Sequence, residues 1–388
     1  MDELNLPSVN GNAVRVTAGE TSVIVSSPDP GIIDWITGYV TPWWHIASAN
    51  AADGPLVVAT VSGVDEVAAE VAAGAWEEVG YPRATTRYAR KEDDTVIAVT
   101  PGERVAYRYT PSLHRMDVHG HESLTLARAS VRVARELVRA QMVGAGWTLL
   151  HASAAVMPDG RAVLTLGGRG AGKSTVAFTL ASRGAGLLGN DRVFARVHRD
   201  GGVELAPWPS GAAVGLGLLG ALGWMDIARQ RLANGAGPHP SQDPRVTAAL
   251  LAGTTTALRE GTRELKAHIR PEEFFSWYGL TGASSGRVAA VLFPAFHSDA
   301  EPKIEPGRTA AVADADFVMG AQEDSYPDIF GLTGGLGAGS AHARAAVAAE
   351  LDKLPGYAVV LSHDHGANAV LLTSVAQGAD ADVPTVRG

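Results

Sequence analysis

At residues 161–182 the chain reads RAVLTLGGRGAGKSTVAFTLAS. The first six residues alternate as in a β-strand, and residues 175–182 have the composition of a helix. The loop between them, residues 167–174, matches the pattern G-x-x-x-x-G-K-[ST] at every fixed position. Glycines let successive backbone N–H groups of such a loop point at phosphate oxygens, and the positive end of the following helix favours the same anion. The stretch therefore predicts a strand–loop–helix unit that binds a nucleotide.

The positions of this loop, called the P-loop below, have distinct expected roles. Lys173 is expected to reach the β- and γ-phosphates, and the Ser174 hydroxyl to be a ligand of Mg²⁺. The backbone of the loop and of the first helical turn should surround the phosphates. The predicted nucleotide-binding residues are Gly167, Gly168, Arg169, Gly170, Ala171, Gly172, Lys173, Ser174 and Thr175.

An acidic residue is predicted to complete the site. Asp191 follows a short predicted strand, residues 186–188, and comes 18 positions after Lys173. A carboxylate at this place can hold Mg²⁺, or accept the proton of an attacking hydroxyl. The structural alternative is an aspartate that caps the turn after Gly189 and Asn190.

His151 ends a predicted buried strand, residues 147–150, just before the P-loop strand. If the two strands are neighbours in one sheet, its ring lies near the phosphates, where it could orient Asp191 or contact the γ-phosphate. The alternative is a structural histidine with no part in the site.

The first 120 residues have the pattern of an α+β domain. Short β-rich runs occur at residues 14–16, 22–25, 56–61, 95–100 and 104–110. Residues 64–76 have apolar side chains at helical spacing. Residues 28–31, PDPG, are typical of a turn. We expect this domain, residues 1–120, to recognise the substrate or partner.

Residues 122–143 predict a long amphipathic helix. Its apolar stripe consists of Leu124, Ala127, Val131, Ala134, Val138 and Met142. A second stripe consists of Arg128, Arg132, Arg135 and Arg139. We interpret the arginines as a solvated face, the alternative being a surface for an anionic partner.

From residue 147 onward the pattern is that of a nucleotide-binding α/β layer. Further strands are expected at residues 288–293 and 357–361, and a helix at residues 340–354. The predicted fold class is α/β: a P-loop kinase-like domain, residues 121–388, with a mixed sheet and flanking helices, preceded by the smaller α+β domain.

The composition excludes several classes of protein. The chain has 388 residues, 46% of them hydrophobic, which is enough for a buried core. It has no cysteine, so disulfides, thiolate metal sites and cysteine nucleophiles are excluded. A formal charge of −9 argues against broad nucleic-acid binding. Without a signal-like N-terminus or a long apolar run, we expect a cytoplasmic protein that does not enter a membrane.

Three stretches together resemble a known family. Residues 149–154, LLHASA, the P-loop with Thr175, and residues 187–193, LLGNDRV, look like the catalytic domain of the HPr kinase/phosphorylase family. The resemblance is closer to the HPr-kinase-like proteins of bacterial peptide and natural-product gene clusters. It covers roughly residues 145–375 and is specific only in its first fifty residues.

The resemblance implies a kinase that uses ATP and Mg²⁺ and whose acceptor is a serine-type hydroxyl. It implies catalytic roles for His151, Lys173, Asn190 and Asp191, with Ser174 and Asp191 at the metal. It also favours a homo-oligomer, since that family forms hexamers. The acceptor would be a hydroxyl of a peptide, a protein or a small metabolite.

Two positions depart from the family pattern. The family has an aspartate, its usual proton acceptor, where this chain has Asn190. Its Mg²⁺-binding glutamate and a nearby arginine correspond to Ala212 and Val214. Activity on the HPr protein is therefore not expected. A second hypothesis follows, in which the protein is a nucleotide-binding adaptor or chaperone of a biosynthetic partner, with weak or no phosphotransfer. A different donor, such as GTP or pyrophosphate, is a third.

Two His-x-His pairs are candidate metal ligands. His119 and His121 form one pair, and His363 and His365 the other. Neither has an evident third ligand in the sequence. The second pair follows the predicted strand 357–361, where a contact at the rim of the nucleotide site is conceivable.

Overall fold

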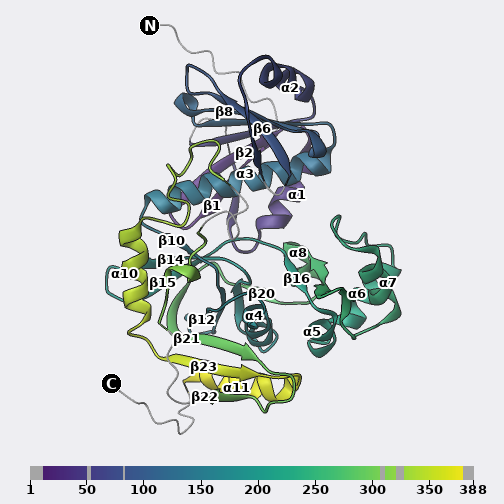
Figure 1. The fold of residues 1–388 in the computed structure, drawn as a ribbon, viewed down its shortest axis with the longest axis vertical. Coiled ribbons are helices and arrows are strands. Elements are labelled where there is room, and N and C mark those ends of the chain that lie inside the picture. Colours follow the sequence, from purple (N-terminus) through teal and green to yellow (C-terminus); the bar gives the residue numbers. More distant parts are fainter. Residues whose placement is uncertain (1–11, 50–53, 82–83, 306–310, 320–326, 379–388) are drawn as a thin grey trace. The chain divides into compact units, whose positions relative to one another are not determined.

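The computed structural model describes residues 12–49, 54–81, 84–305, 311–319 and 327–378. The chain is of the mixed α/β type and groups into two compact units (Figure 1). Unit 1 comprises Met1–Gly146 and Met319–Gly337, and unit 2 comprises Trp147–Val318 and Ala338–Gly388. No helix among the described residues has both the length and the apolar composition needed to cross a bilayer.

Within its described residues, unit 1 is built on one nine-stranded sheet. In spatial order its strands are β3 (His45–Ser48), β1 (Asn12–Ala18), β2 (Thr21–Ser27), β4 (Leu56–Thr60), β9 (Arg115–Gly120), β8 (Val105–Thr110), β7 (Val96–Thr100), β6 (Thr85–Arg90) and β5 (Glu77–Gly80). Only the pairs of β4 with β2 and with β9 are parallel among the pairs of this sheet in the described chain. The strands predicted in this part of the chain are therefore confirmed, and several more exist.

Helices cover both faces of this sheet. Helix α2 (Val64–Ala73) packs on one face, where Val67 and Val71 meet Ala106 of β8. Helix α3 (Ser123–Gly144) lies on the other, where Tyr107 of β8 contacts it. Successive residues of a strand point to opposite faces, so β8 packs against α2 through Ala106 and against α3 through Tyr107.

Helix α1 (Pro30–Val40) was not predicted. The PDPG stretch that is typical of a turn begins this helix instead. Pro30 occupies the first helical position, and the Asp29 side chain accepts a hydrogen bond from the Gly31 N–H, as a helix N-cap does.

Three of the four arginines of the α3 stripe are buried and the fourth, Arg128, is half-buried, so their interpretation as a solvated face is wrong. Arg132, Arg135 and Arg139 are only 8%, 7% and 1% exposed. Arg139 donates to the Gly337 carbonyl at 2.7 Å and to Glu136 at 3.2 Å. Gly337 belongs to the segment 327–337, which returns to unit 1 late in the sequence and places Phe330 against three tyrosine rings.

Helix α3 therefore belongs to unit 1 by its contacts, although we predicted the second domain to begin at residue 121. Its apolar stripe packs on β2, β4 and β9. Near its C-terminal end the Gln141 side chain donates to the Ser22 carbonyl at 3.0 Å. The two units are thus divided at residue 146.

Unit 2 is built on a mixed ten-stranded sheet in the described part of the chain. The main order is β10 (Thr148–Leu150), β14 (Val193–Val197), β15 (Val203–Pro207), β21 (Gly286–Phe296), β12 (Arg161–Thr165), β11 (Ser153–Val156), β13 (Gly186–Gly189) and β20 (Thr281–Gly282). Strand β23 (Gly356–Leu361) pairs with the end of β21, and β22 (Lys303–Glu305) pairs with β23.

Helices lie on both faces of this sheet too. Helices α4 (Lys173–Ala181) and α11 (His365–Gln377) form one core with β12, β21 and β23. Helix α10 (Ala341–Leu351) packs on the opposite face. The predictions of α4, α10, β21 and β23 are confirmed within a few residues.

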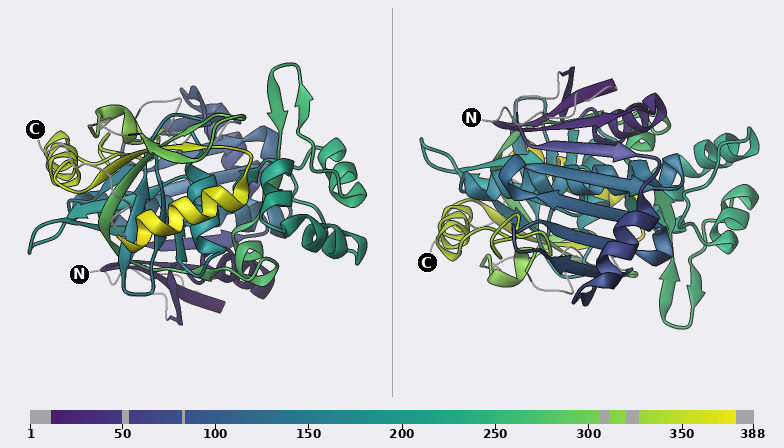
Figure 2. Two further views of the ribbon diagram at one scale, coloured as in Figure 1. Left: turned by 90° about the horizontal axis from the view of Figure 1, so that it is seen from below. Right: turned by 90° about the horizontal axis from the view of Figure 1, so that it is seen from above.

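A smaller region, residues 212–276, stands to one side of the sheet of unit 2 (Figures 1 and 2). It contains the helices α5 (Leu216–Ala221), α6 (Trp224–Ala233), α7 (Pro244–Ala252) and α8 (Pro271–Ser276). It also contains two ribbons, β16 (Ala212–Val214) with β19 (Ala267–Ile269), and β17 (Leu258–Glu260) with β18 (Arg263–Leu265). Phe178 of α4 packs between Trp224 and Phe274, which attaches this region to the P-loop helix.

Candidate functional site

The topology of unit 2 brings the predicted site residues to one edge of the sheet. Strand β11 runs antiparallel to both β12 and β13 and lies between them. The carboxyl ends of β12 and β13 therefore lie beside the start of β11. Strands β12 and β13 are thus parallel to each other, with β11 between them. His151, just before β11, is consequently at the same edge as the P-loop and Asp191.

The P-loop follows β12 directly and leads into α4. Gly167, Gly170 and Gly172 have φ values of 133°, 82° and 111°, which only glycine adopts readily. A Cβ at Gly172 would also lie 3.1 Å from the Leu361 side chain. The glycines thus give the loop a backbone path that other residues could not follow.

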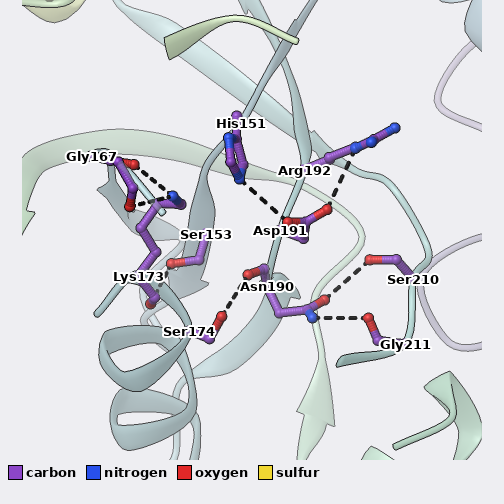
Figure 3. Close-up of polar contacts among 11 residues, drawn as sticks. His151, Ser153, Gly167, Lys173, Ser174, Asn190, Asp191, Arg192, Ser210 and Gly211 are labelled. Carbon is purple, nitrogen blue, oxygen red and sulfur yellow. Dashed lines mark hydrogen bonds and ion pairs between the residues drawn. The ribbon is translucent and has the colours of Figure 1, made fainter. Parts of the chain in front are cut away.

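Lys173 begins α4 and folds back over the loop. Its Nζ donates to the carbonyls of Gly167 at 2.6 Å and Gly168 at 3.2 Å (Figure 3). The residue is 7% exposed. The ammonium group is therefore held at the concave side of the loop, where a bound phosphate would meet it.

Ser153 anchors the start of the same helix. Its hydroxyl donates to the Lys173 carbonyl at 2.6 Å. Sequence reasoning missed this residue, since a serine in a buried strand resembles any other small core residue. Its contact fixes α4 against β11, and so fixes the distance between the P-loop and His151.

His151 and Asp191 form a polar pair. The His151 Nε2 lies 3.4 Å from Asp191 Oδ1, and the Arg192 Nε lies 3.5 Å from Asp191 Oδ2. Partial burial by itself would raise the pKa of Asp191. The hydrogen bond from His151 and the charges of Arg192, His151 and Lys173 outweigh it, so the pKa lies below its usual range. The carboxyl is thus held ionised while 51% of its side chain stays exposed.

Asn190 has a different orientation from Asp191. Its side chain bonds to two residues 20 and 21 positions later: Nδ2 donates to the Gly211 carbonyl at 3.2 Å, and Oδ1 accepts from the Ser210 hydroxyl at 3.2 Å (Figure 3). Asn190 is 3% exposed. The structure therefore places this predicted catalytic side chain on the chain that leads into β16, and not on the P-loop. Nothing in the sequence pointed to Ser210 or Gly211.

The donor set suits a divalent cation of the Mg²⁺ type. The Ser174 hydroxyl donates its proton to the Asn190 carbonyl at 3.1 Å, which leaves its lone pairs available to a metal. Ser174 and Asp191 would hold the ion together with phosphate oxygens, and hard oxygen ligands of this kind are those Mg²⁺ prefers. Within the described ranges, this edge included, no group of three or more His, Cys, Asp or Glu residues is placed to bind a metal, so phosphate oxygens would have to complete the ligand set.

Comparison with known proteins adds no assignment. No protein-family model matches the sequence, and no curated protein is significantly similar to it.

Proposed function

We propose that unit 2 is an ATP-dependent kinase that transfers the γ-phosphate to an alcohol hydroxyl of a peptide, a protein or a small metabolite. One observation carries the proposal. At one edge of one sheet, a P-loop with its lysine and serine lies beside an ionised, half-exposed carboxylate paired with a histidine. Binding of phosphates alone would not require the last two groups.

The residues at this edge would have distinct roles in the transfer of the phosphoryl group. The P-loop backbone and Lys173 would hold the phosphates and neutralise charge on the transferring group. Ser174 and Asp191 would hold Mg²⁺, which supplies further charge neutralisation when bound. Asp191, oriented by His151, would accept a hydrogen bond from the attacking hydroxyl. Phosphoryl transfer depends more on positioning and charge than on a strong base, so one carboxylate can serve.

The kinase proposal is tested by following label from γ-³²P-ATP. Wild type would be incubated with Mg²⁺ and with serine-containing peptides, small polyols or a cell extract as acceptors. We expect a labelled phosphate ester of the acceptor in wild type and at least about 100-fold less of it in Lys173→Ala or Asp191→Asn. Label released only as inorganic phosphate, at the same rate in wild type and Asp191→Asn, would contradict the proposal.

A second function is favoured by Asn190. The family-like acid is missing there, and the amide that replaces it connects the P-loop edge to the chain entering β16. On this reading the protein binds nucleotide and acts as an adaptor for a biosynthetic partner. Nucleotide binding without any labelled acceptor, together with partner affinity that changes with the nucleotide, would favour the adaptor over the kinase.

A further inference from the structure

Two aromatic side chains lie at the rim of the P-loop edge, on the side away from Asp191. Phe296 ends β21, and His363 follows β23. Their ring centroids are 4.9 Å apart and their planes are at 73°. Phe296 is 41% exposed, so one part of its ring is open to a ligand. The interactions described above assign neither residue a role.

The register places this pair beside the P-loop. Strands β21 and β23 run parallel to each other, and β21 runs parallel to β12, so all three carboxyl ends lie at one edge (Figure 1). Pro294 and Leu361 are the side chains nearest to a Cβ placed at Gly172. Phe296 comes two residues after Pro294 in the same strand, so both point to the face that carries α4.

The turn that carries His363 is firmly held. The Asn368 side chain accepts from the Ser362 N–H at 3.0 Å and donates to the Ser362 carbonyl at 2.7 Å. Both residues are buried. The His297 N–H donates to the Leu361 carbonyl at 2.9 Å and joins the two strand ends. The ring pair is therefore presented by rigid backbone on both sides.

The direction of a bound nucleotide follows from the Mg²⁺ ligands. Ser174 bonds to Asn190 on the β13 side of the P-loop, and Asp191 lies on that side too. The terminal phosphates would therefore face β13. The nucleoside end would leave the loop on the other side, where β21 and β23 end.

We propose that Phe296 and His363 form the subsite for the base of a nucleoside triphosphate; this inference rests on the proposed nucleotide-dependent function. Two rings near a right angle form a corner in which a planar base can stack on one ring and meet the edge of the other. The imidazole nitrogens can hydrogen-bond to the polar edge of the base. We call this pair the base platform.

The experiment compares a ligand that has a base with one that has none. Isothermal titration calorimetry would measure the affinity of Mg-ATP and of Mg-tripolyphosphate for wild type, Phe296→Ala, Phe296→Trp and His363→Ala. Loss of stacking should weaken ATP about 5- to 100-fold in Phe296→Ala. Tripolyphosphate should stay within about 2-fold in all variants, because the P-loop is untouched, and Phe296→Trp should retain ATP affinity. Val370→Ala, which removes an exposed side chain of α11, is the matched control and should change neither affinity.

The outcomes separate this inference from the proposed function. If wild type binds ATP and tripolyphosphate equally well, or if Phe296→Ala weakens both to the same degree, the base platform is wrong while the P-loop site stands. If wild type binds neither ligand, the proposed function fails and the base platform with it. Unchanged melting temperatures of the variants would show that loss of ATP affinity is local.

Discussion

Both units carry basic residues on a helix, the arginines of α3 in unit 1 and Lys173 of α4 in unit 2, and their surroundings differ. On α3 the arginines are buried, and Arg139 bonds to Glu136 and to the Gly337 carbonyl. At the P-loop edge Lys173 donates to the backbone carbonyls of Gly167 and Gly168, beside a carboxylate that is half exposed. The first group has internal counter-charges and holds its unit together. The second lies beside groups that a ligand can reach. The comparison teaches that the surroundings of a cation, more than its spacing, indicate its role.

The largest effect is expected from Lys173→Ala. Removing the ammonium should lower phosphotransfer by two orders of magnitude or more, because a major charge contact of the transferring group is lost. Nucleotide at about 100 times its Kd stabilises a protein by about 2.7 kcal/mol, and this stabilisation should vanish in the variant. Thermal unfolding with and without Mg-ATP measures it. If Mg-ATP raised the melting temperature of the variant as much as that of wild type, Lys173 would have no role in nucleotide binding.

Asp191→Asn should come next. We expect transfer to fall about 10²- to 10⁴-fold while ATP binding is retained in part, since a neutral amide can neither accept the proton nor offer a charged metal ligand. His151→Ala should have a smaller effect, because His151 acts through Asp191. Initial velocities measure phosphotransfer and calorimetry measures the Kd of ATP, so the effects on rate and on binding are separated. Equal losses of ATP affinity and of transfer rate in Asp191→Asn would argue that the carboxylate only holds the metal.

The lowered pKa of Asp191 also predicts a pH dependence of stability. Its folded-state pKa lies below the unfolded value of about 3.9, so the ionised form stabilises the fold above that pH. This contribution should disappear as the pH falls through the folded-state pKa. The free energy of unfolding of wild type, minus that of Asp191→Asn, should therefore shrink between pH 7 and pH 3. If this difference in unfolding free energy grew toward low pH, the pKa of Asp191 would be raised in the folded state and not lowered.

Arg139→Ala tests whether the buried arginines of α3 stabilise unit 1. It leaves Glu136 without this charged partner in a buried site, which should cost about 3 to 5 kcal/mol of unfolding free energy. Arg128→Ala, on the same helix but without a described ion pair, should cost less than about 1 kcal/mol. Urea unfolding measures both. ATP affinity of folded Arg139→Ala should be unchanged, and a large loss of affinity would show that the two regions are coupled.

The smallest effect is expected from Asn190→Asp. The change introduces a carboxylate beside Asp191 but removes the amide donor to the Gly211 carbonyl, which should destabilise the fold by about 1 to 3 kcal/mol. We expect no gain in phosphotransfer, because the side chain faces Ser210 and Gly211. Ser210→Ala is the control for the second bond. A rise in transfer would mean that residue 190 can turn toward the substrate.

Much of the candidate site could be predicted because its signals are local. A P-loop needs consecutive residues, and a strand end can be read from a short apolar run, so Lys173, Ser174 and Asp191 were found. Ser153 and Ser210 were missed because each acts through a distant partner. Ser153 bonds to the Lys173 carbonyl and Ser210 to the Asn190 side chain, and both partners are 20 positions away in sequence. A common polar residue carries no sign of such a partner.

The fold of unit 1 was harder to predict for a related reason. The burial of Arg139 depends on a segment almost 200 positions later, which has no periodic pattern and resembles a connector. Helix α1 was missed because proline and aspartate are typical both of turns and of helix starts. In each case local chemistry allowed two structures, and distant packing selected one.

The late return of residues 327–337 has a consequence for biosynthesis. A chain leaves the ribosome from its N-terminus, and domains generally fold as they emerge. The sheet of unit 1 and α3 are complete by residue 146, yet Phe330 and the Gly337 carbonyl are made only after most of unit 2. During that interval Arg139 and the tyrosines beneath Phe330 lack these partners. Unit 1 thus reaches its final packing only near the end of translation, and a fragment ending at residue 146 would keep that surface uncovered.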